Sequence, residues 1–171
     1  MHSFSTGTRG EQSTSQQMIP FSPLQLKQHL FTIVNVRANP EGKPDGPVQL
    51  NQHVVHLPVP GKSNQWQVEL YINIHSGDAK RLFCYELELH VVGIVEVHGE
   101  MEKEKREAIA AVNGLSLLYG AAREMVMNIT ARSPHGPYCL PSLNFAEVLK
   151  QAKPGPLPLA LATASAAVTA Q

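Results

Sequence analysis

Two histidines three residues apart form the first pair in this sequence that could carry metal chemistry. His53 and His56 lie in a segment rich in valine and leucine, which is typical of a strand. Side chains three residues apart on a strand point to opposite faces, unless a bulge realigns them. Neither a cysteine nor a carboxylate pair completes the four-ligand shell that zinc prefers. The spacing therefore does not predict a metal site.

A cysteine and a histidine four residues apart suggest a nucleophile and its base. Cys139 and His135 lie in SPHGPYCLP, an irregular segment in which no Asp or Asn is placed to orient the imidazole. Glu86 and Glu88 are two residues apart on a predicted strand, so their side chains share one face of it. Exposure of that face to solvent is enough to explain both carboxylates. A phosphate loop of the G-x-x-x-x-G-K-S/T type is missing. We therefore predict no enzyme and no cofactor, and a small enzyme centred on Cys139 or a carboxylate is the competing hypothesis.

The composition narrows the class of protein further. Fourteen lysines and arginines balance fourteen acidic residues in a chain of 171, whereas a nucleic-acid binder needs a basic excess. Two cysteines, Cys84 and Cys139, are too few for a disulfide framework and suit a reducing compartment. Residues 1–20 have no apolar signal core, and no run approaches the ~18–20 apolar residues of a membrane span. We expect a cytoplasmic protein that neither inserts into membranes nor binds nucleic acid.

The ends of the chain differ in composition from its middle. Residues 1–20 are rich in serine, threonine and glutamine, and residues 153–171 are rich in proline and alanine without a carboxylate. Such segments cannot bury enough apolar surface to fold. We therefore expect disordered tails at 1–20 and 153–171 around a single domain at 21–152.

Four segments have the apolar pattern of β-strands, at residues 30–36, 48–59, 66–75 and 83–97. In the second segment the apolar residues change phase at Val54-Val55, which predicts a β-bulge, and Pro58 and Pro60 favour an edge position. Gly93 is expected to interrupt the fourth strand. Because the connections between successive segments are short, we expect an antiparallel sheet.

After the fourth strand the apolar period becomes helical. A charged helix start leads to Asn113-Gly114, which predicts a break, and an apolar stripe continues to about residue 132. A short last helix begins at Asn144, whose side chain is expected to cap the amide of Glu147 while Glu147 reaches back. The fold class is therefore α+β: a four-stranded antiparallel sheet, a long helix and a short C-terminal helix.

Three blocks of the sequence are specific enough to indicate a family. Residues 117–124 (LLYGAARE) resemble a helix of the type I-L-F-P-Y-A-R-E, and residues 142–149 (SLNFAEVL) resemble the segment P-V-N-F-x-A-L that follows it. Residues 85–97 (YELELHVVGIVEV) are similar to a strand that runs F-x-C-E-V-Q-Q-x-G-I-F-x-I. In these blocks the sequence resembles the SecB export chaperones, and the similarity extends over about residues 25–150.

The resemblance implies an ATP-independent holdase that binds unfolded preproteins and passes them to the SecA motor of the Sec pathway. It also implies a homotetramer, a dimer of dimers assembled through the long helix. Family members hold the client chain in grooves lined by apolar and aromatic side chains. The matching positions for client binding or subunit contact are Tyr85, Leu87, Leu89, Val91, Leu118 and Tyr119.

Some positions depart from the family pattern. The family's acidic surface and acidic tail help it to dock on SecA, whereas this chain is neutral and its tail has no Asp or Glu. Gly120 and Ala121 replace the family's helix proline and the tyrosine after it. We expect these replacements to change the bend of the helix and the shape of the client groove. A SecB-like chaperone dedicated to the antitoxin of a toxin–antitoxin system is therefore an alternative. A protein that uses its apolar strand for one permanent assembly partner is another.

Overall fold

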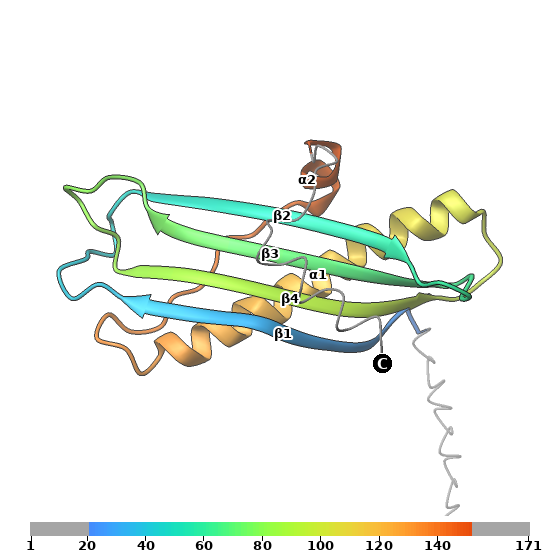
Figure 1. Ribbon diagram of the computed structural model, residues 1–171, viewed down its shortest axis with the longest axis horizontal. Coiled ribbons are helices and arrows are strands. Elements are labelled where there is room, and N and C mark those ends of the chain that lie inside the picture. The colour runs from blue at the N-terminus through green and yellow to red at the C-terminus, as the bar shows by residue number, and fades with distance from the viewer. Residues whose placement is uncertain (1–20, 152–171) are drawn as a thin grey trace, which may run out of the picture.

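The computed structural model describes residues 21–151 as a sheet of four strands with two helices (Figure 1). The predicted tails, residues 1–20 and 153–171, lie outside the described residues. The element bounds are β1 Leu24–Ala38, β2 Val48–Pro58, β3 Gln65–Ser76, β4 Tyr85–Val97, α1 Lys103–Thr130 and α2 Phe145–Gln151. All strand pairs are antiparallel, in the order β1-β4-β3-β2. The predicted α+β fold is confirmed, with β1 and β2 at the sheet edges.

The sheet and α1 form two layers around one apolar core. One face of β3 carries Trp66, Val68, Leu70, Ile72 and Ile74, all of which are buried. The same alternation places the apolar side chains of β4 on this inner face, and α1 crosses it obliquely (Figure 1). The opposite, outer face carries mainly polar residues. Neither helix among the described residues is long and apolar enough to span a membrane.

Gly93 does not interrupt β4, because the strand continues through it and pairs with neighbours on both sides. A Cβ at this position would lie 2.7 Å from Cδ2 of Leu118 on α1. The glycine therefore allows close approach of the helix to the sheet. The predicted interruption was wrong because a glycine in a strand pattern indicates either a break in the strand or a close contact with another element, and the sequence does not distinguish the two.

The predicted helix break at Asn113-Gly114 was also wrong, since α1 runs unbroken for 28 residues. Gly114 is buried, and a Cβ there would lie 3.1 Å from Cγ2 of Val68 and 3.3 Å from Cγ1 of Val95. The helix rests on the sheet at this point. Tertiary packing thus outweighs the cost of a helical glycine, which is about 1 kcal/mol relative to alanine.

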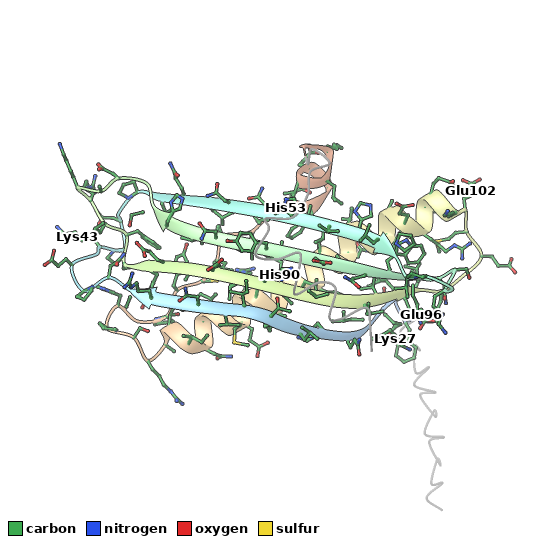
Figure 2. All side chains as sticks on the ribbon, viewed as in Figure 1. Lys27, Lys43, His53, His90, Glu96 and Glu102 are labelled. Atoms are coloured by element: carbon green, nitrogen blue, oxygen red, sulfur yellow. The ribbon has the colours of Figure 1, made fainter. Side chains whose placement is uncertain are left out.

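The bulges lie in β1 and not at Val54-Val55, where β2 pairs with β3 without a register shift. As an edge strand, β2 is half-buried on both faces only over residues 53–56, which explains the mixed apolar pattern there. In β1 the extra residues are Lys27 and Thr32, and each contacts a β4 side chain. Lys27 Nζ lies 3.1 Å from a carboxylate oxygen of Glu96 (Figure 2). Thr32 Oγ1 lies 2.5 Å from Nδ1 of His90.

The short helix α2 begins directly after Asn144, as predicted. Its cap differs in detail, because the Asn144 side chain accepts a hydrogen bond from the Ala146 amide at 3.1 Å and not from that of Glu147. The Glu147 carboxylate contacts Lys150 Nζ at 2.8 Å instead of reaching back. An asparagine cap is sufficient to start this helix without the reciprocal bond.

Candidate functional site

The six residues expected to contact clients or other subunits all lie in the core of the single chain. The most exposed of them is Tyr119, at 4 %. All six belong to the core cluster between sheet and helix, and five of them have exposures at or below 2 %: Tyr85, Leu87, Leu89, Val91 and Leu118. β4 is a central strand, and its apolar face packs against α1 and the segment that follows it. In the single chain these six side chains are therefore not accessible to a client or to another subunit.

The two tyrosines of this set position the segment between the helices, residues 131–144, which we call the return segment. Tyr85 donates a hydrogen bond to the carbonyl of Gly136 at 2.5 Å. Tyr119 donates one to the carbonyl of Pro141, and its ring packs edge-on against Phe145 of α2 with centroids 5.5 Å apart. Burial raises the pKa of Tyr119 to about 12, so its hydroxyl remains a donor at neutral pH.

The return segment has further contacts that occupy the residues considered for catalysis. Nε2 of His135 lies 2.7 Å from the carbonyl oxygen of Asn39. The guanidinium of Arg123 donates to Sγ of Cys139 at 3.1 Å. These hydrogen bonds tie His135 and Cys139 to different partners, so they do not link the two as a nucleophile and its base.

The histidine pair on β2 occupies opposite faces, as predicted. In the strand register, His53 lies opposite Tyr71, and His56 lies opposite the core residue Val68. Nε2 of His56 is 3.5 Å from a carboxylate oxygen of Glu107 on α1. Within residues 21–151, no group of three His, Cys, Asp or Glu side chains could hold a metal ion.

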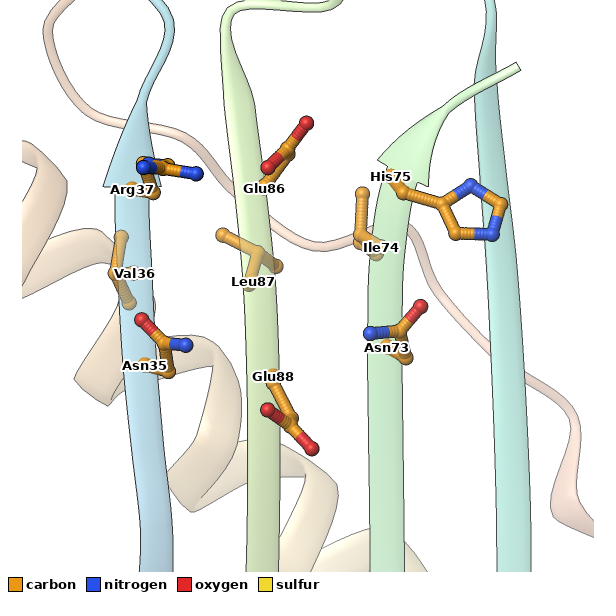
Figure 3. Close-up of a pocket in the computed structure, with 9 residues that line it drawn as sticks. All are labelled: Asn35, Val36, Arg37, Asn73, Ile74, His75, Glu86, Leu87 and Glu88. Atoms are coloured by element: carbon orange, nitrogen blue, oxygen red, sulfur yellow. The ribbon is translucent and has the colours of Figure 1, made fainter.

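The outer face of the sheet has a shallow polar basin of about 580 Å³ near the β1–β2 loop (Figure 3). Its lining alternates between polar side chains on the outer face and apolar ones directed toward α1. The polar ones are Asn35, Arg37, Asn73, His75, Glu86 and Glu88. Glu86 and Glu88 share this face, as their spacing predicted, and Glu88 accepts a hydrogen bond from Tyr71 at 3.0 Å. Such a surface suits a charged partner better than an apolar one.

Of the large apolar side chains that are exposed among the described residues, two lie on the edge strand β2, two on β1 and three on α1. Leu57 is 51 % exposed, and Val48 at the other end of the strand is also exposed. Leu50 and Val54 are half-buried and pack against the core. Among the described strands, β2 pairs only with β3, so its other backbone edge is open to a further strand. Pro58 and Pro60 indicated an edge strand in the sequence, but its binding potential was not recognised.

Exposed apolar side chains also occur on α1 and on β1 in the part of the chain that the structure describes. The face of α1 directed away from the sheet includes Leu117, which is 44 % exposed, and Gly120, where a Cβ would meet nothing within 4 Å. β1, the other edge strand, carries the exposed side chains of Leu30 and Val34. Exposed apolar residues grouped on one helix face and one strand edge are typical of subunit contacts.

This arrangement of sheet and helices is that of a SecB-like chaperone. The structure is similar to that of the SecB-like chaperone Rv1957 of Mycobacterium tuberculosis, which was solved with a ChAD peptide from the HigA1 antitoxin. The TM-score is 0.51 at 18 % identity, over 70 % of this chain and 90 % of that chain. A protein of unknown function from Streptococcus agalactiae is similar over 70 % of this chain and 97 % of its own, with 11 % identity and a TM-score of 0.44.

The family follows from the sequence match. Residues 21–154 match the family model described as preprotein translocase subunit SecB, and the chain therefore belongs to the SecB family. No curated protein matches the sequence. Membership supports a chaperone function, and the SecB-like chaperone family is non-enzymatic.

Proposed function

We propose that this protein is an ATP-independent holdase that binds unfolded preproteins in the cytoplasm and keeps them competent for Sec-dependent export. The observation that carries the proposal is the match to the SecB model over residues 21–154, in a chain whose edge strand β2 is open and apolar. A holdase needs no catalytic group. It needs surface that binds many sequences and that a folded protein would not engage.

The open edge of β2 meets that need through its backbone. An extended client segment that adds to the sheet forms main-chain hydrogen bonds, which are independent of the client's sequence. Apolar client side chains gain contact with the exposed side chain of Leu57 and with the half-buried Leu50 and Val54. Each apolar side chain that is buried contributes about 1.5–3 kcal/mol before entropic costs. Folded proteins hide both kinds of group and are therefore not bound.

The six core residues have an indirect part in this proposal. Leu87, Leu89 and Val91 fix β4 under α1, while Tyr119 and Tyr85 hold the return segment and α2. They are positioning residues for the client surface, since a client cannot touch them unless the core opens.

We further propose that the protein is a homotetramer, a dimer of dimers. The support is that the outer face of α1, with Leu117 and Gly120, and the edge of β1, with Leu30 and Val34, are apolar and exposed in the single chain. Two distinct self-contacts per chain are what a dimer of dimers requires. Several client sites in one particle then act together, because binding at one raises the effective client concentration at the others.

The proposal also includes a partner that receives the client from the chaperone. SecA is the partner expected in export, and we propose the carboxylates of Glu86 and Glu88 in the outer-face basin as contacts for it. A dedicated antitoxin is the alternative client, and it is supported by the antitoxin peptide bound to the similar M. tuberculosis chaperone. A pull-down with purified SecA and, separately, with an antitoxin peptide distinguishes these roles.

The experiment that tests the holdase is a titration of a permanently unfolded, fluorescently labelled polypeptide with the full chain in the absence of ATP. We expect saturable binding that the same polypeptide in its folded form does not compete for. No binding of the unfolded polypeptide, or equal competition by the folded form, would overturn the proposal.

A further inference from the structure

The open edge of β2 lies within reach of the sequence that follows α2. α2 ends at Gln151, and its apolar residues Val148 and Leu149 pack against the same core as Leu50 and Val54 of β2. In the view of Figure 1, α2 lies at the β2 side of the sheet. Whatever follows Gln151 therefore starts at the side of the sheet where β2 lies in that view.

The twenty residues after α2, AKPGPLPLALATASAAVTAQ, have the composition of a client. Lys153 is the only charged residue among them, and the apolar residues include Leu157, Leu159 and Leu161. From Leu159 onwards there is no proline, so every residue can donate its amide to a strand ladder. Leu159 and Leu161 are two residues apart and would share one face of such a strand.

The length of this segment is sufficient to cover β2. At about 3.3 Å per extended residue, twenty residues span roughly 65 Å, whereas the eleven residues of β2 span about 36 Å. The prolines at 154, 156 and 158 favour an extended lead from α2 to the strand edge.

We propose that residues 154–171 bind the open edge of β2 as a built-in competitor of the client, with Leu159 and Leu161 beside Leu50 and Val54. This inference rests on the proposed function, because the segment occupies the same surface. Tethering gives the segment an effective concentration in the millimolar range, so only clients with several apolar stretches displace it. The segment would thus raise the threshold for binding and shield an aggregation-prone edge between clients.

The test uses the full chain with Leu159→Asp and Leu161→Asp together, which removes the apolar contacts without touching the described fold. Ala160→Asp with Ala162→Asp is the matched control, since it adds the same charge on the other side of the extended segment. Hydrogen exchange is measured without client, on the amides of β2 and, as a reference for folding, on those of β4. Affinity for an unfolded polypeptide is measured in parallel.

We expect β2 amides to exchange about three- to tenfold faster in the leucine variant than in the wild type or the alanine control, with β4 unchanged. Client affinity should rise by a similar factor. Equal β2 exchange in all three proteins would overturn the inference. It would also be overturned if protection of β2 depended on protein concentration, because a second copy would then be the occupant. The exchange result needs no client, so it is separate from a failure of the holdase proposal, which would appear as loss of client binding in all three proteins.

Discussion

The hydroxyl of Tyr119 on α1 donates a hydrogen bond to the backbone carbonyl of Pro141, three residues before the cap of α2. The Tyr119 ring also packs against Phe145, the first residue of α2. One buried side chain thus joins the long helix to the return segment and to the short helix. This relationship connects the stability of the core to the position of α2, which lies at the β2 side of the sheet in the view of Figure 1.

Replacing Tyr119 by phenylalanine should lower the free energy of unfolding by about 0.5–1.5 kcal/mol, since the part-buried hydrogen bond to the Pro141 carbonyl is lost. The ring contact with Phe145 remains, so the change in the free energy of unfolding reports the hydrogen bond alone. Urea unfolding measures this free energy. Tyr138→Phe is the matched control, because the backbone amide of Tyr138, and not its hydroxyl, bonds Thr130. Equal losses in the two variants would contradict this account.

The same tyrosine predicts a pH dependence. Burial raises the pKa of Tyr119 from 10.0 to about 12, so the folded state holds the phenol proton more tightly than the unfolded state does. Its contribution to stability is complete below pH 10 and is lost as the pH rises towards 12. Chemical unfolding between pH 9 and about pH 11.5 should show a smaller decline in Tyr119→Phe than in the wild type. Identical declines would show that Tyr119 does not titrate in this way.

Gly114 predicts a steric limit at the contact between helix and sheet. Gly114→Val should destabilise the protein by about 1–3 kcal/mol, because its side chain must enter the packed space beside Val68 and Val95. Asn113→Val is the control, since it places the same side chain at the adjacent, exposed position of α1. Thermal unfolding should separate the two variants, and a Gly114→Val protein as stable as the control would refute the close approach.

Leu57 and Leu117 separate client binding from assembly. Leu57→Asp on β2 should weaken binding of an unfolded polypeptide by about tenfold or more, since it places a charge on the proposed client edge. Leu117→Asp on α1 should reduce the oligomer mass and leave the affinity per chain nearly unchanged. Light scattering and fluorescence titration measure the two effects. If both variants bind clients as the wild type does, β2 is not the client edge.

The sequence predicted the fold class correctly because the alternation in β3 and β4 and the helical stripe are strong, regular signals. It placed the start of β1 six residues late, at Leu30 instead of Leu24. The extra residues Lys27 and Thr32 break the two-residue period, so pattern reasoning finds only part of this strand.

The candidate site was harder to predict than the fold. An apolar face such as that of Leu87 and Leu89 has the same pattern whether it binds a client or packs under the chain's own helix. Only the placement of Leu118 and Gly93 at the same contact shows that α1 covers it. Conversely, the exposed edge of β2 consists mainly of backbone, which leaves little trace in the residue pattern apart from Pro58 and Pro60.

The most direct test of the holdase proposal is aggregation of a denatured, slowly folding protein after dilution into buffer without ATP. We predict that the full chain, added at a stoichiometric amount, suppresses the light scattering, and that Leu57→Asp suppresses it less. Scattering that rises as fast with the wild-type chain as with buffer alone would contradict the proposed function.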